Sequence, residues 1–216
     1  MRTARITEAS LRLMACAVML LVTAGCKVVP MEDVAVARAR DRGEFDVASF
    51  VTDIWPGRVT QELRARAVPL QDFRKGVDEL GPRHGNRAGE GSPWTLVFRG
   101  TGIVRDIDRE SPRGRMQVDT AIGPVAIQTG PVVSGSTIRD ALPFITFDHF
   151  PDQISFAEAG MALTDNALGR LRPALASVKV GDRVAFLGTA SATADQSALV
   201  LTPVELTVQG GGGAPR

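Results

Sequence analysis

The sequence contains no tyrosine, and its 216 residues include only two cysteines and two histidines. Aromatic residues make up 5% of the chain, which leaves little material for a sugar-binding platform built from stacked rings. A zinc site usually needs three or four protein ligands from Cys, His and carboxylates. The best candidate set, His149 with Asp148 and Asp152, offers only one imidazole, so we expect no metal site.

Neither sign of charge is in excess. The chain has 25 basic and 24 acidic side chains, for a formal net charge of +1 at pH 7. Proteins that bind nucleic acid need a basic surface that neutralises the phosphate backbone. The balanced charge therefore excludes nucleic acid as an expected partner.

A long hydrophobic run is also missing, apart from one near the N-terminus. Leu13–Val22 is an apolar segment of about ten residues, preceded by Arg2, Arg5 and Arg12. This run is too short to cross a hydrocarbon core of about 30 Å, but it suits the hydrophobic region of a signal peptide. The N-terminal segment is therefore predicted to be an export signal.

The signal segment ends in "LVTAGC", which resembles a bacterial lipobox. Ala24 and Gly25 are small residues that fit the site of a signal peptidase, and Cys26 supplies a thiol that accepts diacylglycerol. Thr23 stands where leucine is usual. We therefore predict lipidation at Cys26, since two or three acyl chains anchor a protein stably. An unlipidated signal peptide that happens to hold a cysteine is the alternative.

Cleavage before Cys26 would remove three arginines and one glutamate and leave 22 basic and 23 acidic side chains. It would also remove Cys16, so the mature chain could form no internal disulfide. We predict a tether before the folded domain and a glycine-rich disordered tail after it. The expected division is a signal peptide (1–25), a tether (26–44), one domain (45–208), which could instead form two lobes (45–150 and 151–208), and a tail (209–216).

The first part of the domain shows helical spacing, which ends in a glycine-rich stretch. Pro56 and Pro69 interrupt the spacing, so two helices around a break are predicted. Residues 81–93, "GPRHGNRAGEGSP", are predicted to form an exposed loop with a solvated His84. Apolar residues that share one face of the predicted helices are Leu63, Leu70, Phe73, Val77 and Leu80.

From Trp94 onward the apolar spacing changes to the alternation of strands. We predict a strand with a kink at "GTG", a hairpin in "GRMQVDTAIGPVAIQTG", and two further strands around the turn "ATADQS". The segments "LVFRGTG" and "VAFLGTA" resemble each other. They indicate either two similar small barrels or one barrel with strands from both halves of the chain.

Residues 130–160 contain a dense set of polar side chains. Thr137 and Asp140 fit a helix-capping box, and Pro143 should stop that helix after one turn. Residues 144–147, "FITF", are predicted to form a short buried strand, and Asp152 to cap the next helix. The predicted buried face of that helix consists of Ile154, Ala157, Met161, Leu168 and Leu171.

These polar residues allow several chemical interpretations besides capping. A serine hydrolase would use Ser134 or Ser136 with His149, but the G-x-S-x-G elbow is absent. A metal site would use Asp148, His149 and Asp152, which is a sparse ligand set. Arg139 fits a local ion pair with Asp140 or a hydrogen-bond bridge to backbone carbonyls, and anion binding is the alternative.

Several blocks in a fixed order resemble the predicted periplasmic lipoproteins grouped as domain of unknown function 2291. They are "KVVP", "FDVASFVTDIW", "GTGIVRDID", residues 130–160 and "LTPVEL". Asp152 stands where the family usually has asparagine. The family motif G-P-V-x-x-G-[ST]-x-[LI]-R-D-[AS] is matched by Gly130, Pro131, Val132, Gly135, Ser136, Ile138, Arg139, Asp140 and Ala141. The resemblance implies an OB-like barrel with added helices, no established activity, and genes near those of sugar ABC transporters.

We therefore expect an α+β, mainly β fold, an OB-like antiparallel β-barrel with packed helices. The expected function is that of a lipid-anchored envelope lipoprotein on the periplasmic side of a bacterial membrane. It would be a non-catalytic binding or accessory module, associated with a sugar ABC transporter component or a small solute, without a cofactor. The alternative is an envelope hydrolase that uses His149 and Asp148. The candidate binding residues are Arg139, Asp140, Asp148, His149 and Gln153.

Overall fold

The computed structural model describes residues 45–133, 135–192 and 199–209. The predicted signal peptide, Cys26, the tether, Ser134 and most of the turn "ATADQS" lie outside the described residues. So do residues 210–216 of the predicted tail. Gln209, which the sequence placed in the tail, is the last residue of a strand.

The first part of the described chain is helical up to a break at Ala67. Pro56 does not break it, because a π-helical turn accommodates the proline and Thr60 N donates to the carbonyls of Trp55 and Gly57. The break instead lies at the short strand β1. The elements are α3 (Val47–Ile54), η2 (Trp55–Val59), α4 (Thr60–Arg66), β1 (Val68–Pro69), the 3-10 helix η3 (Leu70–Lys75) and α5 (Val77–His84).

The predicted loop at residues 81–93 begins later than expected. Its first four residues complete α5, with Pro82 inside the helix. Gly81 is buried because the indole of Trp94 lies where its side chain would be. His84 is exposed, as predicted.

Five longer strands and β1 form a six-stranded sheet. Its order is β1-β2-β3-β4-β6-β5. Because β2 also pairs with β5, each of the five longer strands has at least two neighbouring strands. The predicted hairpin is confirmed as β3 and β4, with Gly123 at a φ of 113° in the turn. The longer strands are β2 (Trp94–Asp108), β3 (Arg115–Thr120), β4 (Gly123–Gln128), β5 (Arg183–Ala192) and β6 (Leu199–Gln209).

The two similar segments of the sequence are neighbours in this one sheet. In the antiparallel pair of β2 and β5, Leu96 lies opposite Ala190 and Gly102 opposite Val184. Two separate small barrels are therefore not formed. The sheet also joins the two lobes considered from the sequence, because β5 and β6 pair with β2 and β4.

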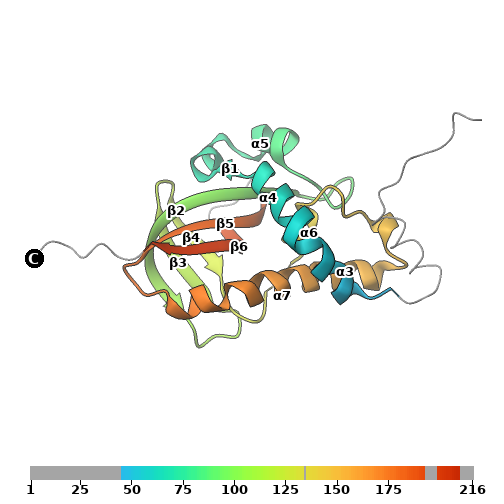
Figure 1. The fold of residues 1–216 in the computed structure, drawn as a ribbon. Coiled ribbons are helices and arrows are strands. Elements are labelled where there is room, and N and C mark those ends of the chain that lie inside the picture. Colours follow the sequence, from blue (N-terminus) through green and yellow to red (C-terminus); the bar gives the residue numbers. More distant parts are fainter. Residues whose placement is uncertain (1–44, 134, 193–198, 210–216) are drawn as a thin grey trace, which may run out of the picture. The chain divides into compact units, whose positions relative to one another are not determined.

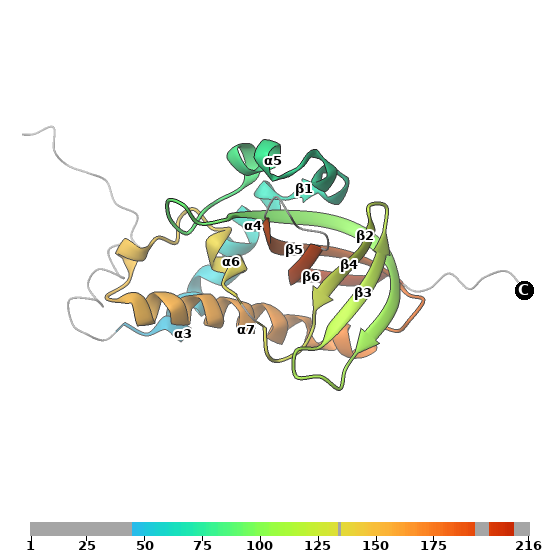
Figure 2. The same ribbon diagram turned by 180° about the vertical axis from the view of Figure 1, so that it is seen from behind.

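The sheet is mixed and not purely antiparallel, since β1 pairs with β2, and β4 with β6, in parallel. The fold is α+β, but the expected predominance of strands is not confirmed. Helices hold more of the described residues than strands do. In both views α5 lies on one side of the sheet and α7 (Gln153–Ser177) on the other (Figure 1 and Figure 2).

The kink predicted at "GTG" is a site of close approach between strands. A side chain at Gly102 would collide with the Asp119 carbonyl and Val118 of β3, so only glycine fits there. The break in register lies just beyond it, between Val104 and Asp106. There β2 leaves β5 and continues alongside β3 alone.

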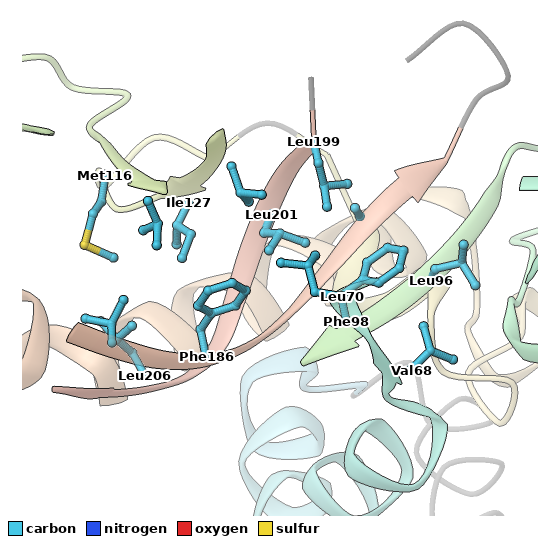
Figure 3. Packing of buried hydrophobic residues seen from close by; sticks show 14 of the residues in the cluster. Val68, Leu70, Leu96, Phe98, Met116, Ile127, Phe186, Leu199, Leu201 and Leu206 are labelled. Atoms are coloured by element: carbon cyan, nitrogen blue, oxygen red, sulfur yellow. The ribbon is translucent and has the colours of Figure 1, made fainter. Parts of the chain in front are cut away.

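Two hydrophobic clusters form the core, and alternate residues of the strands divide between them. In β2, Leu96 and Phe98 enter the first cluster, whereas Val97 enters the second, between the sheet and helices α3, η2, α4, α6 and α7. Figure 3 shows Phe98, Phe186 and Leu201 projecting into the first cluster. Because Leu96, Val97 and Phe98 are buried on both faces of the sheet, this part of β2 shows no alternation of apolar and polar residues.

Two predictions for residues 137–171 are wrong. The segment "FITF" is not a strand: Phe147 begins the 3-10 helix η4 (Phe147–His149) and is 43% exposed. The predicted buried face of α7 is confirmed at Leu168 and Leu171 but is wrong in the first half of the helix, which packs against α3 and the short helix α6 (Thr137–Asp140) through other residues. Ile154, Ala157 and Met161 are exposed, and the buried residues are Ala159, Gly160, Leu163, Thr164, Ala167, Leu168 and Leu171.

Candidate functional site

Arg139 is buried and its guanidinium is engaged within the domain. Nε donates to Asp140 Oδ1 at 2.8 Å, and the two remaining nitrogens donate to Ser136 Oγ at 2.9 Å and the Phe156 carbonyl at 3.0 Å. The guanidinium also lies 3.8 Å from the centre of the Phe156 ring. Arg139 thus joins α6 to the first turns of α7, and the predicted local ion pair with Asp140 is present.

The predicted capping role of Thr137 is wrong. Ser136 occupies the N-cap position of α6 without a side-chain cap, and its hydroxyl donates to Asp140 Oδ2 at 2.7 Å. The Thr137 hydroxyl faces the sheet, where it lies 2.8 Å from Thr189 Oγ1 and donates to Thr202 Oγ1 at 3.0 Å. These hydroxyls dock α6 on β5 and β6.

The other candidate residues lie around the start of α7. Asp148 and His149 belong to η4, where Asp148 is exposed and His149 is half-buried. His149 Nδ1 faces Thr146 and accepts a long 3.5 Å hydrogen bond from its backbone N–H. Gln153 is exposed. As predicted, Asp152 caps α7 and accepts from Ser155 N at 2.8 Å.

A cleft of about 660 Å³ lies beside the second half of α7, and none of the five candidate residues lines it. Its walls are the loop between β2 and β3, residues 129–131, and α7. The residues that line it include Asp108, Arg109, Thr129, Gly130, Pro131, Asp165, Leu168, Arg172 and Leu175.

Backbone contacts between two loops build one wall of this cleft. Thr129 N donates to the Gly114 carbonyl at 3.0 Å, and Val132 N donates to the Pro112 carbonyl at 3.0 Å. Gly130 packs against this loop so closely that a side chain would collide with the backbone of residues 112–114. The start of the family motif thus shapes the cleft.

The two arginines of the cleft have different roles. Arg109 donates to the carbonyls of Leu175 at 3.0 Å and Val178 at 2.6 Å, and so satisfies the last turn of α7. Arg172 is exposed, and within the described part of the chain it forms no ion pair. Asp165 lies two helical turns before Arg172 on the same face. The cleft therefore presents an acceptor and a donor that are free to bind a solute.

Sequence reasoning missed this cleft because it is assembled from three separate segments. The signal that was available is the pair Gly130 and Pro131 at the start of the motif.

Among the residues the structure describes, there is no group of three or more His, Cys, Asp or Glu side chains that could hold a metal ion. No helix within these ranges is long and apolar enough to cross a membrane.

Comparison with solved structures supports the fold. An OB-fold protein from Thermotoga maritima shares 14% identity, with a TM-score of 0.59 over 76% of this chain and 99% of that one. An OBody bound to hen egg-white lysozyme shares 12% identity, with a TM-score of 0.31 over 56% of this chain and 83% of that one. Only the first similarity is informative, because the TM-score of the second is low. At 14% identity the first similarity concerns the fold alone.

No curated protein matches the chain. A protein family described as predicted periplasmic lipoprotein, DUF2291, matches residues 16–207, which include all the described strands except the end of β6. The chain therefore belongs to the DUF2291 family of predicted periplasmic lipoproteins.

Proposed function

We propose that the protein is a lipid-anchored, non-catalytic binding module on the periplasmic side of a bacterial membrane, and that the cleft beside α7 binds a small polar solute. The observation that carries the proposal is the contrast between two arginines. The guanidinium of Arg139 donates its hydrogen bonds to groups within the domain, whereas Arg172 lines an open cleft.

The composition of the cleft favours a polyhydroxylated solute such as a sugar. The carboxylate of Asp165 can accept hydrogen bonds from hydroxyls and the guanidinium of Arg172 can donate them. Leu168 and Leu175 supply apolar surface for the C–H faces of a ring. The volume of about 660 Å³ lies within the range of roughly 300–1,000 Å³ typical of small-molecule sites.

The resemblance to lipoproteins encoded near sugar ABC transporters supports an accessory role in carbohydrate uptake. In this role the lipid on Cys26 would hold the domain at the membrane, close to the transporter. Mass spectrometry of the mature N-terminus tests the anchor. A mature chain that begins with an unmodified residue would contradict it.

A thermal-shift screen of the purified protein against monosaccharides and short oligosaccharides tests solute binding. A solute at 100 times its Kd stabilises a folded protein by about 2.7 kcal/mol, which is readily measured. Asp165→Ala and Arg172→Ala should each abolish the shift. Arg170→Ala is the matched control, because Arg170 lies on another face of α7 and donates to Asn166. The absence of any shift with the wild-type protein would refute the cleft as a sugar site.

A further inference from the structure

The first half of α7 exposes an apolar stripe. Ile154 is 71% exposed and Met161 is 58% exposed, and Ala157 lies exposed between them. Their spacing of three and four residues places them on one face of the helix. The remaining exposed large hydrophobic residues of the described chain are on other elements or loops: Ile103, Val132, Phe147 and Val180.

Acidic side chains lie along this part of α7. Asp152 caps the helix before the stripe, Glu158 lies beside the stripe and Asp165 follows it, whereas residues 140–169 contain no lysine or arginine. Helix α3, which packs against α7, adds Asp53 and has no basic residue. Asp152 is ionised at neutral pH, as any exposed aspartate is, and the hydrogen bond from the backbone N–H of Ser155 lowers its pKa further.

Basic groups near this end of the domain are already engaged. Arg139 is buried over Phe156. Arg58 lies 4.1 Å from the centre of the Phe144 ring. The exposed face of α7 thus combines an apolar centre with carboxylates before it, beside it and after it along the helix.

We propose that this stripe binds a cationic amphipathic helix of another envelope protein. The apolar residues of that helix would cover Ile154 and Met161, with the small side chain of Ala157 allowing close approach. Its lysines or arginines would face Asp152 and Glu158. This is the helix-in-groove mode of recognition, in which charge complementarity adds specificity. The inference identifies the partner class for the accessory role proposed above and rests on that role, but not on solute binding.

Two other occupants fit the charges less well. In an antiparallel pair with a second copy, Ile154 would meet Met161 of that copy. The same register places Glu158 opposite Ala157 of the second copy and therefore beside that copy's Glu158, and like charges repel. An anionic bilayer would be repelled by the same carboxylates.

The experiment uses the unacylated mature chain, residues 26–216 with Cys26→Ser, which includes every described residue. The probe is a fluorescent 18-residue helical peptide with leucine on one face and lysine on the other, and binding is measured by anisotropy. The double variant I154S/M161S should weaken binding at least tenfold, and Glu158→Lys should weaken it severalfold and reduce its salt dependence. Val180→Ser, a matched change at a residue that is 62% exposed, should have no effect.

Other outcomes would overturn the proposal. They are unchanged binding by I154S/M161S, equal binding of a leucine–glutamate peptide, self-association in sedimentation that Met161→Ser abolishes, and stronger binding to anionic vesicles than to the peptide. Tighter peptide binding after Arg38, Arg40 and Arg42 are changed to alanine would assign the stripe to the chain's own residues and would also overturn the proposal. Sugar-induced thermal shifts of I154S/M161S should stay normal, which separates failure of this proposal from failure of the solute site.

Discussion

The guanidinium of Arg139 lies 3.8 Å from the centre of the Phe156 ring while one of its nitrogens donates to the carbonyl of the same residue at 3.0 Å. One side chain therefore fixes both the ring and the backbone of the first turns of α7. Together with the ion pair to Asp140, this contact explains why a conspicuous Arg–Asp pair has a structural role.

Arg139→Ala should destabilise the domain by roughly 3–5 kcal/mol, because it leaves the largely buried Asp140 carboxylate without its cation. Urea denaturation measures the loss. Arg139→Lys should retain only part of the stability, since an ammonium cannot reproduce the three directed hydrogen bonds. The cost of R139A/D140A should fall short of the sum of the single changes. Wild-type stability of Arg139→Ala would show that the network is not structural.

Gly130→Ala should destabilise the domain by about 1–3 kcal/mol, because the added methyl group collides with the backbone of residues 112–114. It should also weaken any sugar-induced thermal shift, since the collision displaces a wall of the cleft. Gly169→Ala is the control in α7. A methyl group there meets nothing within 4 Å, so stability should rise by up to about 1 kcal/mol. Equal effects of the two changes would contradict this account of the wall.

Phe98→Ala should cost about 3–5 kcal/mol, since Phe98 is fully buried in the first hydrophobic cluster. Ile103→Ala on the same strand should cost only about 1 kcal/mol, because its side chain is 37% exposed and is outside the hydrophobic clusters. Thermal and chemical denaturation of the two variants compare them directly. An equal loss of stability in the two variants would contradict the division of β2 into core and surface positions.

Asp152 and Asp46 should make stability depend on pH in the acid range. Hydrogen bonds lower the pKa of each below the ordinary value of 3.8, mainly from the Ser155 backbone to Asp152 and from the Ser49 side chain to Asp46. A lowered pKa in the folded state stabilises the protein above pH 3.8. This stabilisation is lost as the pH falls below that value. The variant D46N/D152N should show a shallower decline in melting temperature between pH 5 and pH 2; an unchanged decline would exclude both caps as its source.

Some local features of the structure were predicted correctly from local features of the sequence. Pro143 ends α6 after one turn, and Asp152 caps α7. Both depend on covalent geometry or on hydrogen bonds between residues close in the chain. The hairpin of β3 and β4 was predicted for the same reason, since its turn depends on Gly123.

The face of α7 shows where such reasoning fails. Ile154 and Met161 have helical spacing, but so do Ala159, Leu163 and Ala167, and periodicity alone does not choose between the two faces. The choice follows from packing against β6, α3 and α6. Ala159 and Gly160 are small enough to let these elements approach, whereas Ile154 and Met161 lie on the opposite face and remain exposed.

By itself, the sequence determined the family, the strands that follow Trp94, and several helix ends, such as those at Pro143 and Asp152; the export signal with Cys26 stays a prediction. These properties reside in short motifs and in hydrogen bonds between near neighbours. Only the tertiary structure decided that Arg139 is buried, that the cleft forms beside Asp165 and Arg172, and that Ile154 faces solvent. Each of these depends on contacts between segments distant in the sequence, and burial in such contacts changes the role of a side chain without changing its identity.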